Sequence, residues 1–187
     1  MKKIACLFPG IGYTCDKPLL YYSWKLLKSL GWEVVPVPYA GFPSGVKGNP
    51  EKMQQAAHMA LEQAEELLQE IVWNDYDDIL MIGKSVGTVV GAAYARRHRL
   101  PCRLILFTPV EAAFEFAGRK SIVFHGTADP WAETKVIEDN CRRMGIPLFE
   151  TEGANHSLET GDVDADLKAM RKVMKTVREY AEKGSRA

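Results

Sequence analysis

Short apolar segments alternate with amphipathic segments along this chain of 187 residues, and this alternation constrains the fold more than any other feature. The apolar segments have the length of strands, and the amphipathic segments carry apolar residues at helical spacing. Strands are predicted at 4–8, 33–37, 78–82, 103–107, 121–125 and 146–151, and helices at 18–30, 51–73, 86–99, 131–144 and 163–181. The pattern predicts about six mostly parallel strands with helices on both faces and functional loops at the carboxyl ends of the strands.

The composition limits the classes of function. The length fits one domain, residues 1–187, that can bury a core without disulfides or metals. Lys and Arg total 24, as do Asp and Glu, so we expect no basic field of the kind that attracts nucleic acid. The apolar run near the start is too short for a signal peptide or a membrane span. We therefore expect a small-molecule partner, with no nucleic acid and no membrane, while a homodimer through surface helices stays open.

The cysteines indicate the compartment. None of the four lies in a CxxC pattern or at the Cys/His spacing of a metal site. We interpret them as free thiols in a reducing cytoplasm, and we expect neither a metal nor another cofactor. These residues are Cys6, Cys15, Cys102 and Cys141.

The third predicted strand runs into the third predicted helix through Gly83-Lys84-Ser85-Val86-Gly87. Only a sharp turn fits between these elements, and a serine at such a turn holds its hydroxyl clear of the sheet. Glycines two residues before and after it let neighbouring backbone approach without Cβ clashes. The pattern is typical of a nucleophile elbow, with Ser85 as the nucleophile.

A phosphate-binding loop is the alternative interpretation of this stretch. The loop motif Gly-x4-Gly-Lys-Ser/Thr requires a glycine at position 78, where this chain has Asp78. The residues that would form the loop belong instead to a predicted strand. Nucleotide binding is therefore set aside, and Lys84 is expected to be structural or to line a pocket.

Two further titratable residues follow predicted strands. Asp129 follows the fifth strand and His156 the sixth, so both converge with Ser85 at one edge of a parallel sheet. A serine hydroxyl becomes an effective nucleophile when a histidine accepts its proton, and a carboxylate fixes the tautomer of that histidine and stabilises its cation. The three residues therefore predict a catalytic triad in the chain order nucleophile, acid, histidine.

Three motifs give the chain a resemblance to the α/β-hydrolase superfamily, in a compact and nearly lidless form similar to dienelactone hydrolases and esterases. They are the elbow, the sequence HGTADPW at 125–131 and the sequence GANHSL at 153–158. The chain order of the three residues is also that of this superfamily. The resemblance covers essentially the whole chain and implies an α/β-hydrolase fold with a minimal cap.

The resemblance also implies an oxyanion hole. Such a site needs two backbone N–H groups aimed at the developing negative charge, and Val86, at the start of the elbow helix, is expected to supply the first. The loop after the first strand is expected to supply the second, from Ile11 or alternatively from Gly12. Members of the superfamily often have a His-Gly pair in this loop, and here Pro9 stands in the place of the histidine.

Alternatives remain for the acid, and the pocket is defined only by residue type. Glu111 follows the fourth strand and competes with Asp129 for the role of the acid. Asp129 also precedes Pro130 and can cap the helix predicted after it. The residues expected to line an acyl pocket are Gly12, Tyr13, Phe42, Phe114, Trp131 and Leu158.

Together these residues predict a serine hydrolase that cleaves a small ester or thioester through an acyl-enzyme intermediate. The short segment 108–120 leaves little room for a cap, so we expect an open site. Fold analogy does not separate a carboxylesterase from a thioesterase or an amide hydrolase. The alternative is a catalytically idle protein of the same fold that binds a small molecule.

Overall fold

The structure is a computed structural model in which residues 1–46 and 48–184 are described. These residues form a six-stranded parallel sheet with the strand order β2-β1-β3-β4-β5-β6. The strands are β1 (Lys3–Phe8), β2 (Glu33–Pro36), β3 (Asp78–Lys84), β4 (Arg103–Phe107), β5 (Ser121–Gly126) and β6 (Leu148–Thr151). The helices are α1 (Pro18–Ser29), α2 (Pro50–Leu68), α3 (Val86–Arg97), α4 (Thr134–Met144) and α5 (Val163–Lys183), with 3-10 turns η1 (Trp73–Asp75) and η2 (Glu111–Glu115). The predicted fold class is confirmed.

The central strands end together at one edge of the sheet. All residues of β3 are buried, as expected for a parallel strand that is covered on both faces. The register pairs Phe8 of β1 with Gly83 of β3, and Lys84 of β3 with Phe107 of β4. The loops that leave these strands therefore start at the same level, which brings together segments that are far apart in the chain.

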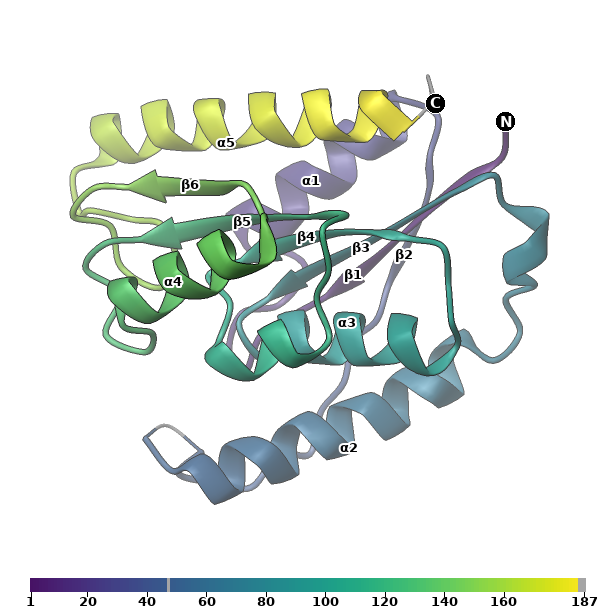
Figure 1. Ribbon diagram of the computed structural model, residues 1–187, viewed down its shortest axis with the longest axis horizontal. Coiled ribbons are helices and arrows are strands. Elements are labelled where there is room, and N and C mark those ends of the chain that lie inside the picture. The colour runs from purple at the N-terminus through teal and green to yellow at the C-terminus, as the bar shows by residue number, and fades with distance from the viewer. Residues whose placement is uncertain (47, 185–187) are drawn as a thin grey trace.

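The helices form unequal layers on the two faces of the sheet (Figure 1). Helices α1 and α5 lie together on one face, and α3 and α4 lie on the other. Helix α2 packs on α3, so it forms an outer layer that α3 separates from the strands. The face that carries α3 is therefore covered more deeply than the face that carries α5.

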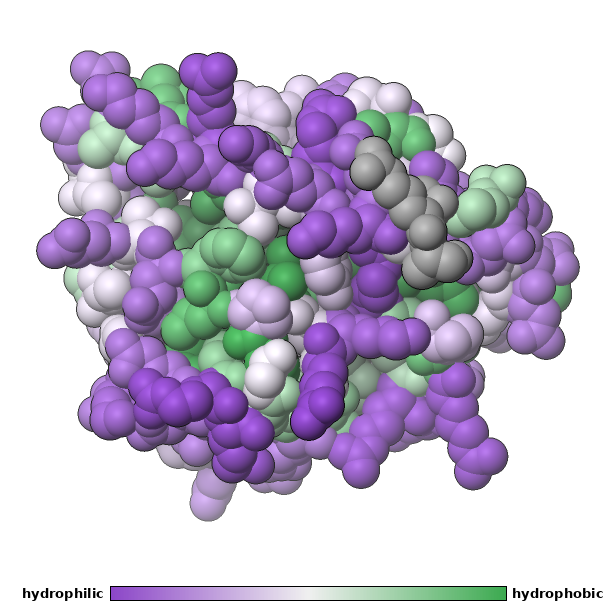
Figure 2. Space-filling model, turned by 45° about the horizontal axis from the view of Figure 1, so that its top comes forward, coloured by the Kyte–Doolittle hydropathy of each residue, from purple (hydrophilic) through white to green (hydrophobic). Residues whose placement is uncertain are grey.

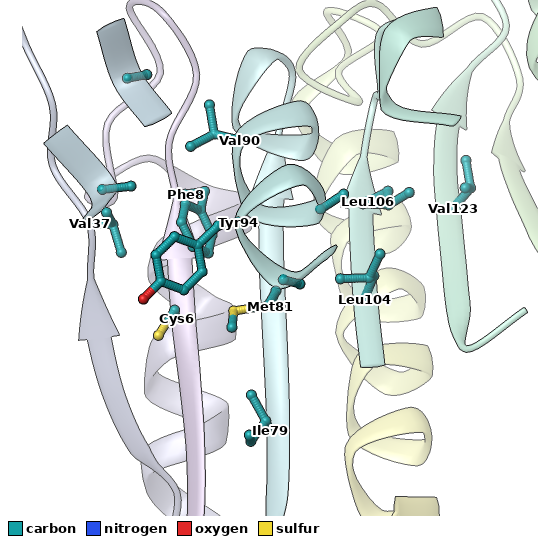
Figure 3. Packing of buried hydrophobic residues seen from close by; sticks show 14 of the residues in the cluster. Cys6, Phe8, Val37, Ile79, Met81, Val90, Tyr94, Leu104, Leu106 and Val123 are labelled. Carbon is teal, nitrogen blue, oxygen red and sulfur yellow. The ribbon is translucent and has the colours of Figure 1, made fainter. Parts of the chain in front are cut away.

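Each face of the sheet has its own hydrophobic core. Figure 3 shows the core beneath α3, where Phe8 and Tyr94 lie beside Cys6 and Met81. A Cβ at Gly91 would lie 2.8 Å from the ring of Phe8, so this glycine lets α3 approach the strand closely. The second core joins the opposite face of the strands to apolar residues of α1 and α5.

Two helices differ from their predicted bounds by three residues or more. Helix α2 ends at Leu68 rather than at residue 73, because the chain turns and places Trp73 against Tyr94 with ring centroids 5.8 Å apart. Helix α4 begins at Thr134 rather than at residue 131. The Asp129 carboxylate accepts a hydrogen bond from the Trp131 N–H at 2.8 Å, which closes a turn before the helix instead of capping it.

A buried ion pair lies at the amino end of the sheet. Arg103 Nη2 at the start of β4 is 2.8 Å from the Asp78 carboxylate at the start of β3. The same guanidinium donates to the backbone carbonyls of Tyr180 and Ala181 in the last turn of α5. A rigid donor fork of this kind ties the end of a helix to two strands.

The surface near α5 carries an apolar area. Figure 2, viewed from the side on which α5 lies, shows hydrophobic side chains surrounded by hydrophilic ones. Residues of β6 and α5 line a surface pocket on this side, and Phe149 of the edge strand β6 stacks on Phe124 with ring centroids 5.3 Å apart. No helix within the described residues is both long and apolar enough to span a membrane.

Candidate active site

The chain passes from β3 into α3 through a single residue, Ser85. Its backbone angles are φ 55° and ψ −124°, and a positive φ is unfavourable for a residue that has a Cβ. The Ser85 N–H donates to the Phe107 carbonyl at 3.0 Å, and the Ser85 carbonyl accepts from the Thr88 N–H at 2.9 Å. These bonds hold the strained turn, which places the serine at the carboxyl end of the central strand as the elbow pattern predicts.

Both glycines of the elbow motif are required by close packing. A Cβ at Gly83 would lie 2.5 Å from the Gly87 carbonyl oxygen, and a Cβ at Gly87 would overlap the carbonyl of Phe8. Contacts this short exclude any side chain. Helix α3 therefore lies directly against the ends of β1 and β3.

The predicted acid and histidine are in contact. His156 Nδ1 and Asp129 Oδ2 are 2.6 Å apart, and the Asp129 side chain is fully buried while that of His156 is 18% exposed. The Thr108 hydroxyl donates to the His156 carbonyl at 3.0 Å and supports the histidine loop from below. Glu111, the competing acid, is exposed on η2. The carboxylate beside the imidazole is therefore that of Asp129.

The loop after β1 forms a tight turn beside the elbow. The Gly10 N–H donates to the Tyr13 carbonyl at 3.0 Å, and the Tyr13 N–H donates to the Gly10 carbonyl at 3.1 Å. Gly12 has φ 73°, as is typical of the third position of such a turn. A Cβ at Gly10 would lie 3.2 Å from the Ser85 Cβ, so the turn packs against the nucleophile. Ile11 occupies the second position, where its N–H takes no part in these two bonds.

Ser85 and His156 line the same pocket, which has a volume of ≈ 230 Å³. Ile11, one of the expected oxyanion donors, lines it as well. Val86, the other expected donor, is the first residue of α3, where an N–H has no acceptor within its own helix.

The expected pocket lining is half correct. Gly12, Tyr13 and Trp131 line the pocket. The other three residues expected in the pocket do not line it, because they pack in or against the hydrophobic cores. Phe114 packs in the core on the α3 side, Leu158 packs in the core on the α5 side, and Phe42 packs edge-on against Tyr39 with ring centroids 5.7 Å apart.

An apolar groove continues from the pocket. It has a volume of ≈ 790 Å³ and runs between α2, α3 and η2. Met53 and Val110 line both the pocket and the groove, and Val86 lines the groove at its elbow end. Met53 and Val110 were not predicted as site residues, although Met53 lies on the apolar face of a predicted helix.

Lys84 is a buried cation next to the nucleophile. It is 1% exposed, and its Nζ lies 4.9 Å from the centroid of the Tyr13 ring. Burial lowers the pKa of Lys84 to about 7, although the Asp129 carboxylate acts in the opposite direction. Lys84 also lines the pocket, as the sequence analysis allowed.

The other histidines lie outside the pocket. His58 is exposed on α2, and His98, at the end of α3, is 2.6 Å from the Glu65 carboxylate. His125 is buried at the end of β5, where desolvation lowers the pKa of its imidazole. The described residues contain no group of three or more His, Cys, Asp or Glu side chains that could hold a metal ion.

Comparisons with known proteins address the fold. Neither a protein-family model nor a curated protein matches this chain. Solved structures do: Est1E from Butyrivibrio proteoclasticus with bound ferulic acid matches with a TM-score of 0.71 at 12% identity, over 99% of this chain and 90% of that one. XC6422 from Xanthomonas campestris, described as an α/β serine hydrolase without lid, matches with a TM-score of 0.63 at 15% identity, over 96% and 81%.

A third structure agrees with these two. An α/β serine hydrolase homologue from Coxiella burnetii has a TM-score of 0.66 at 16% identity, over 94% of this chain and 84% of that one. This chain has the α/β-hydrolase fold. At the level of architecture, this confirms the resemblance drawn from the elbow, acid and histidine motifs.

Proposed function

We propose that this protein is a serine hydrolase that cleaves a small ester or thioester through an acyl-enzyme intermediate. One observation carries the proposal: the buried Asp129–His156 hydrogen bond lies beside the pocket that Ser85 lines. The fold is shared with proteins described as an esterase and as a serine hydrolase, which supports the same class of reaction.

In the proposed reaction, Ser85 Oγ attacks the substrate carbonyl carbon while His156 Nε2 accepts the hydroxyl proton. Asp129 stabilises the imidazolium that forms. His156 then donates the proton to the departing alcohol or thiol, which leaves the acyl group on Ser85. Water attacks this ester with His156 again as the base, and the acid product is released. The transfer requires Ser85 Oγ and His156 Nε2 to come within about 2.6–3.2 Å when substrate is bound.

The negative charge on the carbonyl oxygen would be held by backbone N–H groups. The Val86 N–H at the start of α3 and the Ile11 N–H of the adjacent turn are the proposed donors, since Ile11 lines the pocket and Val86 directly follows the nucleophile. The Gly10 turn packs against Ser85, so these two groups are fixed relative to the nucleophile. The apolar groove beyond Met53 and Val110 offers room for an apolar part of the substrate.

A fluorophosphonate probe tests the proposal directly. Such a probe forms a covalent bond with an activated serine, so we expect stoichiometric labelling of the wild-type protein and none of Ser85→Ala. His156→Ala should label far more slowly because the serine then lacks its base. Ser29→Ala, which changes an exposed serine at the end of α1, is the matched control and should label like the wild type. Intact-protein mass spectrometry measures each outcome.

A folded wild-type protein that stays unlabelled would contradict the proposal. In that case a catalytically idle binding protein of the same fold becomes the better interpretation. A panel of p-nitrophenyl esters of increasing acyl length would then separate the two, because only an enzyme turns them over.

We further propose that the protein works in a reducing compartment such as the cytoplasm. Its cysteines are free thiols, and burial raises the pKa of Cys15, Cys102 and Cys141 to about 11, which keeps these thiols protonated and unreactive at neutral pH. A water-soluble maleimide should label all four cysteines of the unfolded protein. Over the same reaction time, we expect it to label none of them in the native protein.

A further inference from the structure

Lys84 has no role in the reaction proposed above, although it directly precedes the nucleophile. A buried ammonium group is costly unless a counterion or hydrogen-bond acceptors surround it. Among the described residues, no ion pair within 4.0 Å includes Lys84, and its Nζ lies over the face of the Tyr13 ring. The fold therefore retains a buried cation that is poorly compensated.

The nearest carboxylate is already engaged. Asp129 attracts Lys84 at longer range, but its Oδ2 contacts His156 and its Oδ1 accepts from the Trp131 N–H. A carboxylate that must stabilise an imidazolium during catalysis does not serve as a permanent counterion for a second cation. Lys84 thus has the capacity to bind a further anion.

The pocket gives an anion access to this group. Of the described residues that line it, Lys84 alone carries an ammonium group and none carries a carboxylate. Most of the other lining side chains are apolar, so water would screen an ion pair formed here less than at the surface. A volume of ≈ 230 Å³ lies below the about 300–1,000 Å³ that is usual for drug-sized ligands, so the part of the substrate that carries the anionic group must be small.

We propose that the substrate is a short ester or thioester that carries a free carboxylate, and that Lys84 binds this carboxylate while Ser85 attacks the ester carbonyl. This inference deepens the proposed function and rests on it. Half-esters of short dicarboxylic acids are the simplest compounds of this class. Lys84 is then a residue that determines specificity and positions the substrate, and it takes no part in bond making.

Protonation should be linked to binding of the carboxylate. With a pKa of about 7, Lys84 is largely neutral above pH 8, and an ion pair with a carboxylate requires its protonated form. Affinity is therefore full below pH 7 and falls about tenfold per pH unit above it, with one proton taken up per carboxylate bound. The other groups that face Lys84 are Tyr13, whose pKa burial raises to about 12, and Asp129 with its partner His156.

The test uses the Ser85→Ala protein, which binds substrate without turning it over. Isothermal titration calorimetry compares monomethyl succinate with its uncharged twin, dimethyl succinate, at pH 6.5 and 8.5 in buffers of different ionisation enthalpy. We expect at least a tenfold preference for the half-ester at pH 6.5, with proton uptake at pH 8.5. Half-esters from malonate to adipate repeat the comparison at other carboxylate positions.

Two variants in the same background decide whether Lys84 is responsible. Lys84→Met should remove the preference and the proton uptake, and circular dichroism should show that the protein is still folded. Lys175→Met, which removes an exposed lysine of α5, should keep both. A lack of preference across the whole series, or a preference that survives Lys84→Met, overturns the inference.

The outcome is separable from that of the proposed function. Binding is measured in a protein without its nucleophile, so it does not depend on whether the wild type is active. If the probe labels Ser85 but the half-esters are not preferred, the proposed hydrolase function stands and the proposed carboxylate site at Lys84 is rejected. A preference for half-esters in a wild-type protein that resists the probe would keep the carboxylate site and reject the hydrolase.

Discussion

Two cations, the largely buried Arg103 and the fully buried Lys84, lie at opposite ends of the sheet in very different surroundings. Arg103, at the amino end, has the Asp78 carboxylate at 2.8 Å and the last carbonyls of α5 around it. Lys84, at the carboxyl end, lies over the Tyr13 ring, and the carboxylate that attracts it, that of Asp129, is hydrogen-bonded to His156. The positive charge is compensated at the first end and left largely uncompensated at the second.

The contrast shows where the fold is optimised for stability and where it is not. A compensated buried pair holds strands and helix together, and removing one partner leaves the other charge stranded. An uncompensated charge and a strained serine both lower stability, and here they are neighbours at the candidate active site. The four predictions below change one end at a time.

The largest expected effect comes from making the same substitution at both ends. Asp129→Asn should lower kcat/KM for a p-nitrophenyl ester by about 10⁴-fold, because the amide stabilises the wrong tautomer of His156. Asp78→Asn should leave kcat/KM near the wild-type value when it is assayed below its unfolding temperature. Glu111→Gln is the control at the active end and should also stay near the wild-type value. An active Asp129→Asn with an inactive Glu111→Gln would assign the acid role to Glu111.

The amino end should show its effect in stability. Arg103→Met leaves the buried Asp78 carboxylate without its counterion. It should lower the free energy of unfolding by about 3–5 kcal/mol, measured by urea denaturation. Arg178→Met removes an arginine from an exposed pair on α5 and should change it little. Equal effects of the two substitutions would show that the buried pair has no special structural role.

Lys84→Met should have the opposite sign. The pKa of Lys84 is lowered from its ordinary 10.5 to about 7 in the folded protein, so the unfolded chain binds the proton more tightly. The resulting penalty is fully present below pH 7 and disappears as the pH rises through 10.5. We therefore expect Lys84→Met to raise the free energy of unfolding by about 1–4 kcal/mol at pH 6 and by much less at pH 11. A gain that does not depend on pH would reflect packing instead of charge.

The smallest effect is expected at the support of the histidine loop. Thr108→Val keeps the shape of the side chain but removes the hydrogen bond to the His156 carbonyl, and should lower the free energy of unfolding by about 1 kcal/mol. A few-fold loss of kcat/KM should accompany it, because the loop positions the imidazole. Thr176→Val, at a half-buried position of α5 far from the histidine loop, is the matched control and should leave kcat/KM unchanged.

The sequence was sufficient to predict the fold and the position of the three main candidate residues. Short apolar segments that alternate with helices leave few arrangements other than a parallel sheet, and the ends of its strands meet at one edge. Ser85, Asp129 and His156 lie in or just after turns that follow strands, so their convergence follows from topology. Their proposed roles in the reaction still await the probe and the substitutions described above.

The pocket lining could not be predicted in the same way. Whether Phe114 or Leu158 faces a pocket or a core depends on packing between segments that are distant in sequence, which local patterns do not encode. The start of α4 was predicted too early because an aspartate before a proline, as at Asp129-Pro130, occurs both in helix caps and in turns. The burial of Lys84 was also hidden, since a charged residue at the end of a strand usually reaches solvent.

The position of α2 has a consequence for how this protein can diverge. The helix packs mainly on α3 and provides one wall of the apolar groove. Ser85, Asp129 and His156 all lie outside α2, so substitutions on the side of this helix that faces the groove would change the groove without replacing a candidate catalytic residue.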